Sequence, residues 1–383
     1  MSVTLAAGFT AAGLAAGLKS GGRPDVALVV NSGPGFSAAG VFTSNRIKAA
    51  PVLWSEQVLR DGTLRAVVLN SGGANACTGP DGFADTHRTA ETAAAALGCG
   101  AIDVAVCSTG LIGVRLPMDL LAPGVERLAA AVGPDGGLDA ATAILTTDSH
   151  PKQASHRGPG WTIGGMAKGA GMLAPGLATM LVVLTTDAVV TPAVLGGQLG
   201  EACRTTFDRL DSDGCMSTND SVILMSSGAS GVAPSAEDFQ QALTGVCGDL
   251  ARQLLGDAEG ASHDIAITVA GAASVDDAVA VGRSIARSNL FKCAVFGRDP
   301  NWGRVLAALG TTSAAFEPDQ VDVAFNGVQV CRAGAIGEPR ELVDLTPRQV
   351  SVAVDLHAGA ETATIWTNDL TYDYVKENAE YAT

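Results

Sequence analysis

The segment that most constrains this chain is a glycine-rich loop that leads into an apolar run near its centre. Residues 168–181 read KGAGMLAPGLATML, in which three glycines and a proline precede Ala178 and Thr179. Such a backbone can adopt contorted conformations. A threonine hydroxyl is a poor nucleophile unless a base lies beside it, and the free α-amine of an N-terminal threonine is such a base. One interpretation of the pattern is therefore a chain that cuts itself between Ala178 and Thr179, which would free this amine.

A plainer interpretation of the same segment needs no chemistry. The Gly-Ala-Gly sequence then forms only a turn, and Met180 to Leu184 form a buried strand. Spacing alone favours this plainer interpretation over self-cleavage.

Six further segments, spread from one end of the chain to the other, decide between the two interpretations. They are NSGGANACTG (70–79), CSTGLIG (107–113), TTD (146–148), DSDGCMSTND (211–220), GRDPNWGR (297–304) and ENAEYAT (377–383). Together with the central loop, they resemble the ornithine acetyltransferase family, the two-chain glutamate N-acetyltransferases of arginine biosynthesis. Members of that family process themselves at Ala-Thr. The resemblance implies an α chain of residues 1–178 and a β chain of residues 179–383, assembled as an α2β2 heterotetramer.

Composition and pattern predict a mixed α/β protein. The chain has 383 residues, 47% of them hydrophobic and only 4% aromatic, which is enough for a large core built from small aliphatic side chains. Strand-like and helix-like runs alternate without βαβ periodicity, so mixed sheets are expected rather than a doubly wound fold. The expected strands are 26–30, 66–69, 104–107, 180–185, 222–225, 265–269, 320–325, 329–332 and 349–356. The expected helices are 85–97, 235–255 and one that begins at Ser274.

The resemblance adds a specific architecture to this fold class. It implies an α/β fold of the α+β type, with a layered αββα-like core. That core resembles the N-terminal-nucleophile hydrolases in chemistry but not in chain topology. A smaller α+β unit is expected from about residue 285 to residue 383.

Charge and targeting patterns exclude several classes of partner. The formal net charge is −15 and no basic cluster is present, which argues against a nucleic-acid partner. The apolar N-terminus lacks a basic n-region, and the apolar run 172–184 is too short for a membrane helix. Eight cysteines without Cys-x-x-Cys spacing are expected to be buried free thiols. We therefore expect a cytoplasmic protein with small-molecule substrates.

Thr109 and Gly110 are the candidate donors to an oxyanion. They directly follow the predicted strand 104–107, where a glycine lets a backbone N–H approach a ligand and a hydroxyl can assist it. Ser-Thr-Gly after a strand is also a common turn. The resemblance favours the catalytic role.

Candidate substrate-binding residues begin with Lys168, eleven positions before Thr179. Its ammonium is either a solvated loop charge, a partner for a substrate carboxylate, or a group that sets the pKa of the nucleophile. Glu259 offers an anion for a substrate ammonium. The resemblance implies that the amino-acid pocket is lined by Thr146, Lys168, Thr179, Glu259, Asn378 and Thr383.

Other chemistries find little support in the sequence. The five histidines lack metal-ligand spacing, and neither a Gly-x-Ser-x-Gly elbow nor a Walker A loop is present. The glycines of residues 33–40 match no phosphate-binding pattern. Cys215 has no histidine near it in sequence to activate it, and we expect it to be a core residue. We expect neither a metal nor another cofactor.

The resulting hypothesis is an acyltransferase that works by double displacement. N-acetylornithine acylates Thr179, ornithine leaves, and glutamate accepts the acetyl group. An aminopeptidase or amidohydrolase that uses the same threonine with water is the alternative enzyme, and an uncleaved amino-acid-binding protein is the alternative from another class. The residues leave open whether acetyl-CoA is a second donor.

Overall fold

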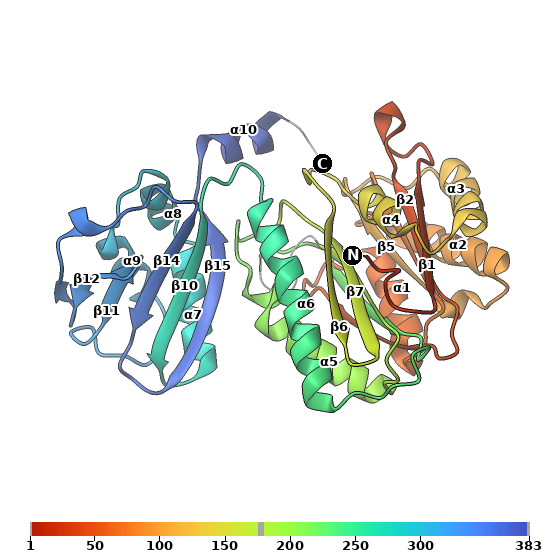
Figure 1. The fold of residues 1–383 in the computed structure, drawn as a ribbon. Helices are drawn as coiled ribbons and strands as arrows, with labels where there is room; N and C mark the ends of the chain where they lie inside the picture. Colours follow the sequence, from red (N-terminus) through yellow and green to blue (C-terminus); the bar gives the residue numbers. More distant parts are fainter. Residues whose placement is uncertain (1, 175–179, 381–383) are drawn as a thin grey trace.

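The computed structural model describes residues 2–174 and 180–380, which form three β-sheets with helices packed on them (Figure 1). The predicted cleavage residues Ala178 and Thr179, and the predicted pocket residue Thr383, lie outside the described residues.

Two mixed sheets form the larger part of the molecule. The first has the order β1-β2-β4-β5 and the second the order β3-β9-β8-β7-β6. Each contains both parallel and antiparallel pairs, with β4 parallel to β5 and β8 parallel to β9. The strands of the first sheet are β1 (Phe9–Leu14), β2 (Val26–Asn31), β4 (Ala66–Ser71) and β5 (Val104–Thr109). Those of the second are β3 (Ser37–Phe42), β6 (Lys152–Gly158), β7 (Trp161–Lys168), β8 (Leu181–Thr186) and β9 (Ser221–Ser226).

These two sheets pack face to face between two layers of helices. Because side chains alternate along a strand, Val183 of β8 and Met225 of β9 join the core of the first sheet, whereas Leu184 and Leu224 pack under the outer helices. The first sheet is covered by α1 (Ala50–Val58), α2 (Gly79–Leu97), α3 (Met118–Ala131) and α4 (Gly137–Ala143), and the second by α5 (Pro192–Thr205) and α6 (Ala236–Gly256). The expected αββα layering is confirmed.

The third sheet builds a separate α+β unit (Figure 1). Its strand order is β13-β12-β11-β14-β10-β15. Strand β10 belongs to this sheet and pairs with both β14 and β15. The sheet therefore includes residues upstream of residue 285, near which the smaller unit was expected to start. Its strands are β10 (Asp264–Ala272), β11 (Asp322–Phe325), β12 (Val328–Arg332), β13 (Ala335–Ile336), β14 (Gln349–Asp355) and β15 (Glu361–Asn368). Its helices are α7 (Val275–Ala286), α8 (Asn289–Phe296) and α9 (Trp302–Leu309), and α10 (Tyr372–Glu380) follows β15.

Local signals explain the helix starts that the sequence predicted. The Ser235 hydroxyl accepts a hydrogen bond from the backbone N–H of Asp238, and Ser274 does the same for Asp277. Acidic residues in both first turns complement the helix dipole. None of the described helices is long and apolar enough to cross a membrane.

The expectation for the cysteines was wrong in part. All eight are free, but Cys77, Cys215 and Cys293 are exposed. Cys215 is therefore not a core residue. Its backbone N–H binds the side chain of Asp213 in a tight turn through Gly214, which has φ +71°, and this turn places Cys215 at the surface.

We predict that Met225→Ala lowers the free energy of unfolding by about 2 to 5 kcal/mol, because it leaves a cavity between the two facing sheets. Met225 is fully buried there. Urea denaturation measures the change. Leu342→Ala is the control, because Leu342 is 61% exposed and its truncation should change stability by less than about 0.5 kcal/mol. Equal losses would contradict the proposed packing.

Candidate functional site

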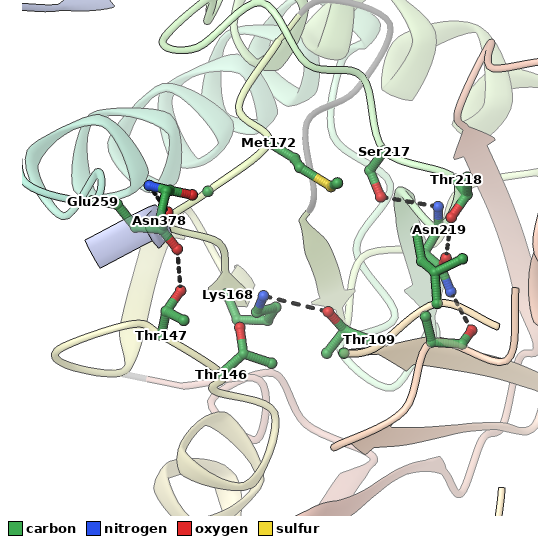
Figure 2. Close-up of a pocket in the computed structure, with 14 residues that line it drawn as sticks. Thr109, Thr146, Thr147, Lys168, Met172, Ser217, Thr218, Asn219, Glu259 and Asn378 are labelled. Carbon is green, nitrogen blue, oxygen red and sulfur yellow. Dashed lines mark hydrogen bonds between the residues drawn. The ribbon is translucent and has the colours of Figure 1, made fainter. Parts of the chain in front are cut away.

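A cavity of about 130 Å³ collects all the predicted site residues that the structure describes (Figure 2). Thr109 is the last residue of β5, Gly110 follows it, and Lys168 is the last residue of β7. The residues that line the cavity are Ala74, Thr109, Gly110, Ile112, Thr146, Thr147, Lys168, Gly171, Met172, Ser217, Thr218, Asn219, Glu259 and Asn378. Residues far apart in sequence therefore meet around one small volume.

Strand register places the start of β8 beside this cavity. Lys168 pairs with Leu181 at the start of β8, and Leu181 follows Thr179 by two positions. Met180 donates its backbone N–H to Oδ1 of the buried Asp220 at 3.1 Å. The described chain thus resumes after the cleavage segment at a point fixed beside the cavity.

Backbone geometry restricts the residue after Thr109 to glycine. Gly110 has φ +129°, and a Cβ at this position would lie 2.5 Å from the backbone nitrogen of Gly73. That nitrogen donates to the Thr109 carbonyl at 3.0 Å. Only a glycine adopts this conformation at such close approach. The strand end therefore has a specific geometry rather than that of an ordinary turn.

Lys168 is not a solvated loop residue. It ends a fully buried strand, and its side chain is 2% exposed. Its Nζ donates to Oγ1 of Thr109 at 3.4 Å (Figure 2). The same Nζ lies 3.7 Å from Oδ2 of Asp148. Burial lowers the pKa of Lys168, and the Asp148 carboxylate opposes this effect. The Lys168 side chain is thus held at the cavity wall beside the Asp148 carboxyl group.

The carboxylate of Asp148 is strongly stabilised despite its burial. Burial alone would raise its pKa, but Lys168 and Lys152 together hold it well below its usual range. The Lys152 ammonium lies 2.6 Å from Asp148 and 2.5 Å from Asp257. Two lysines and two aspartates therefore form a buried, balanced cluster beside the cavity.

Glu259 presents an anion at the opposite side of the cavity from Thr109 (Figure 2). It accepts hydrogen bonds from the Thr147 hydroxyl at 2.8 Å and from the Asn378 amide at 3.0 Å. A Cβ on Gly171 would come within 2.8 Å of its carboxyl group. The close approach of Gly171 lets the loop after β7 pass over Glu259.

Several polar lining residues received no role from the sequence. Asn219 donates its side-chain N–H groups to the carbonyls of Ala74 at 2.6 Å and Ser108 at 2.9 Å, which ties the loop before β9 to the end of β5. Ser217, Thr218 and Asn219 belong to the segment 211–220. This segment is part of the family resemblance, but the sequence predicts no role for these three residues. In the described part of the chain, no three His, Cys, Asp or Glu side chains form a group that could hold a metal ion.

Sequence comparisons with known proteins cover essentially the whole chain, and the solved structures cover about half of it. The sequence model of the ArgJ family matches residues 10–383. The arginine biosynthesis bifunctional protein ArgJ of Streptomyces avermitilis is 66% identical over 382 residues, which is 100% of both chains. Two solved structures were also matched. The ornithine acetyltransferase of Mycobacterium tuberculosis, complexed with ornithine, is 61% identical and covers 47% of this chain and 96% of its own, with a TM-score of 0.45. The ArgJ protein of Bacillus halodurans is 36% identical and covers 51% and 97%, with a TM-score of 0.49.

We predict that Gly110→Ala destabilises the protein more than Gly113→Ala. Both glycines have positive φ, but a Cβ on Gly113 meets no atom within 4 Å. Both variants should therefore lose about 1 kcal/mol through left-handed backbone strain, and Gly110→Ala should lose a further ~1 to 3 kcal/mol through its contact with Gly73. Urea denaturation of the two variants measures the difference. Equal losses would show that the close approach to Gly73 is relieved at no cost.

Proposed function

Because this chain belongs to the ArgJ family, we propose that it transfers the acetyl group of N-acetylornithine to glutamate through an acetyl ester on Thr179. It is an acetyltransferase of arginine biosynthesis. One observation supports the proposed chemistry most strongly. The candidate oxyanion donors Thr109 and Gly110 line one cavity together with Lys168, Glu259 and Asn378. Strand β8, which begins two positions after Thr179, starts beside this cavity.

The first step in this proposal makes the catalytic base. The Thr179 hydroxyl attacks the carbonyl of Ala178, the Ala178–Thr179 C–N bond breaks, and the nitrogen leaves as an amine while the acyl group moves to the hydroxyl. Water then hydrolyses this ester. The products are residues 1–178 and 179–383, and Thr179 now carries a free α-amine.

The transfer reaction then proceeds in two halves. The α-amine takes the proton of the Thr179 hydroxyl as its oxygen attacks the acetyl carbon of N-acetylornithine. The oxyanion accepts hydrogen bonds from the Thr109 hydroxyl and the Gly110 N–H. The C–N bond to ornithine breaks as the proton passes to its departing nitrogen. In the second half, the amine of glutamate attacks the acetyl carbon, the C–O bond to Thr179 breaks, and the proton lost by the attacking nitrogen passes through the α-amine to the Thr179 oxygen. The products are N-acetylglutamate and the free enzyme, and no cofactor takes part.

Charge complementarity supports the substrate assignment. Both substrates are amino acids, which carry carboxylate and amine groups. Glu259, with Asn378 beside it, suits a substrate ammonium, and a lysine ammonium has three N–H donors, so Lys168 keeps a donor for a carboxylate. Thr146 lines the same cavity. We also assign Thr383 to this pocket, the α2β2 assembly to the active enzyme, and the cytoplasm as its location.

The first prediction from this proposal concerns processing. The wild-type protein should yield two fragments, one of which begins at Thr179. Thr179→Ala should remain a single 38.4 kDa chain, whereas Thr179→Ser should still cleave because serine keeps the hydroxyl. Intact-mass spectrometry and N-terminal sequencing distinguish these products. An uncleaved wild-type chain with full activity would contradict the mechanism, and one without activity would favour an amino-acid-binding protein.

The second prediction concerns kinetics. When N-acetylornithine and glutamate are both varied, double-reciprocal plots should give parallel lines, because the acetyl-enzyme separates the two half-reactions. Intersecting lines would indicate direct transfer in a ternary complex. Rapid acetate release without glutamate would support the amidohydrolase alternative, and replacing N-acetylornithine by acetyl-CoA tests the second donor.

The third prediction isolates the oxyanion donor. Thr109→Val removes the hydroxyl and keeps the shape, so kcat should fall by about a hundredfold with little change in KM. Thr109→Ser keeps the donor and should lose much less. If KM rises while kcat stays constant, Thr109 binds the substrate rather than the oxyanion.

A further inference from the structure

A buried carboxylate that this mechanism leaves unused lies behind the cavity. The side chain of Asp148 is fully buried, in the segment between α4 and β6. It accepts hydrogen bonds from one ammonium and two backbone N–H groups, and a second ammonium lies nearby. The donors are Lys152 Nζ at 2.6 Å, Gly169 N at 2.6 Å, Thr146 N at 3.1 Å and Lys168 Nζ at 3.7 Å.

The contacts of Asp148 fix both ends of the lysine that reaches Thr109. Gly169 directly follows Lys168, so the bond from its backbone N–H anchors the peptide at the base of the side chain. The carboxylate also lies near the ammonium at the tip. The Lys168 side chain is thereby held in the position from which Nζ donates to Oγ1 of Thr109.

This donation determines what the Thr109 hydroxyl can do. A hydroxyl has a single hydrogen to donate and accepts through its lone pairs. In the described part of the chain, Thr109 Oγ1 accepts from Lys168 and donates to no other residue. Because an ammonium cannot accept a hydrogen bond, the O–H of Thr109 is left to donate into the cavity, and the adjacent cation makes it a stronger donor.

We propose that Asp148 is a positioning residue for the oxyanion hole. It holds the Lys168 ammonium against Thr109, so that the Thr109 hydroxyl donates to the oxyanion. This inference rests on the proposed function, because it requires an oxyanion at Thr109. Asp148 is not among the residues that line the cavity, and in this proposal it acts through Lys168 and Thr109 in turn.

The charges around Lys168 give the proposal a pH signature. Burial lowers the pKa of Lys168, Lys152 lowers it further, and the Asp148 carboxylate opposes both effects. Among the described residues, the other charged groups that act on Lys168 are Glu259, Asp220 and Lys19. The rate falls as pH rises through the pKa of Lys168, because the neutral amine no longer polarises Thr109. Removing the Asp148 charge should move this alkaline limb to lower pH, and removing the Lys152 charge should move it to higher pH.

The first test is Asp148→Asn, which keeps the shape and removes the charge. We expect kcat to fall about tenfold with KM for both substrates within about twofold, and the alkaline limb of the kcat profile to move to lower pH. Asp187→Asn is the matched control. Asp187 is also buried and accepts two backbone N–H bonds, from Ala7 at 3.0 Å and Thr162 at 2.7 Å, but it lies beyond the far end of β8. It should change neither kcat nor the limb.

A double-mutant cycle tests whether Asp148 acts through Thr109. In a Thr109→Val background, adding Asp148→Asn should cause little further loss of kcat, because the hydroxyl it serves is already absent. A full additional tenfold loss would overturn the proposal. An unmoved alkaline limb in Asp148→Asn would overturn it as well.

Lys152→Met keeps the proposal testable where Asp148→Asn does not fold. It should move the alkaline limb to higher pH, a sign that general structural damage does not explain. The pKa of Lys19, which burial lowers to about 8, is the competing assignment of the limb. In Lys19→Met the limb should remain and move, if at all, to higher pH, whereas its loss would assign it to Lys19. A failure of the proposed function is distinguishable from a failure of this inference, because the wild-type enzyme itself would then show no transfer from N-acetylornithine to glutamate.

Discussion

The buried pairing of two lysines with two aspartates is the interaction on which the site depends. Lys152 binds both Asp148 and Asp257, and Lys168 lies beside Asp148. The four residues come from the segment after α4, the start of β6, the end of β7 and the segment after α6. One charge cluster therefore links the segments that carry Thr146, Lys168 and Glu259, and all three of these residues line the cavity.

Such a cluster contributes little to the free energy of folding, but it fixes the positions of the side chains that form it. The desolvation of buried charges can exceed their mutual attraction, while removal of a single partner leaves an uncompensated charge in the interior. The cluster therefore tolerates one arrangement and penalises the others. A side chain that must stand within hydrogen-bond distance of another, as Lys168 does with Thr109, benefits from that rigidity.

The sequence predicted most strands that contain runs of valine and isoleucine, but it missed β15, which is rich in threonine, and the strands with few β-branched residues. Val26 to Val30 and the strand before Thr109 were predicted, but β7 contains Gly164 and Gly165, which have weak strand propensity. Gly164 is required there, since a Cβ would lie 2.1 Å from the carbonyl of Ser2. Because β7 was missed, its last residue, Lys168, was assigned to a loop in one interpretation.

The candidate site was predicted where a local motif or the family resemblance pointed to a residue, and the resemblance alone gave Glu259 and Asn378, which line the cavity. Thr109 and Gly110 follow a strand and were found, whereas Asp148 lies within a resembling segment but received no role. Its importance comes from contacts with Lys152 and with the end of β7 twenty residues away in sequence, which only the tertiary structure reveals. Asn219 was missed for the same reason, because its partners lie in other sheets and loops.

The most direct test of the central claim is the mass of the fragment that begins at Thr179 after incubation with N-acetylornithine alone. The account predicts a gain of one acetyl group on Thr179 and its loss when glutamate is added. An unmodified fragment in an enzyme that still transfers acetyl groups to glutamate would contradict the acetyl-threonine intermediate.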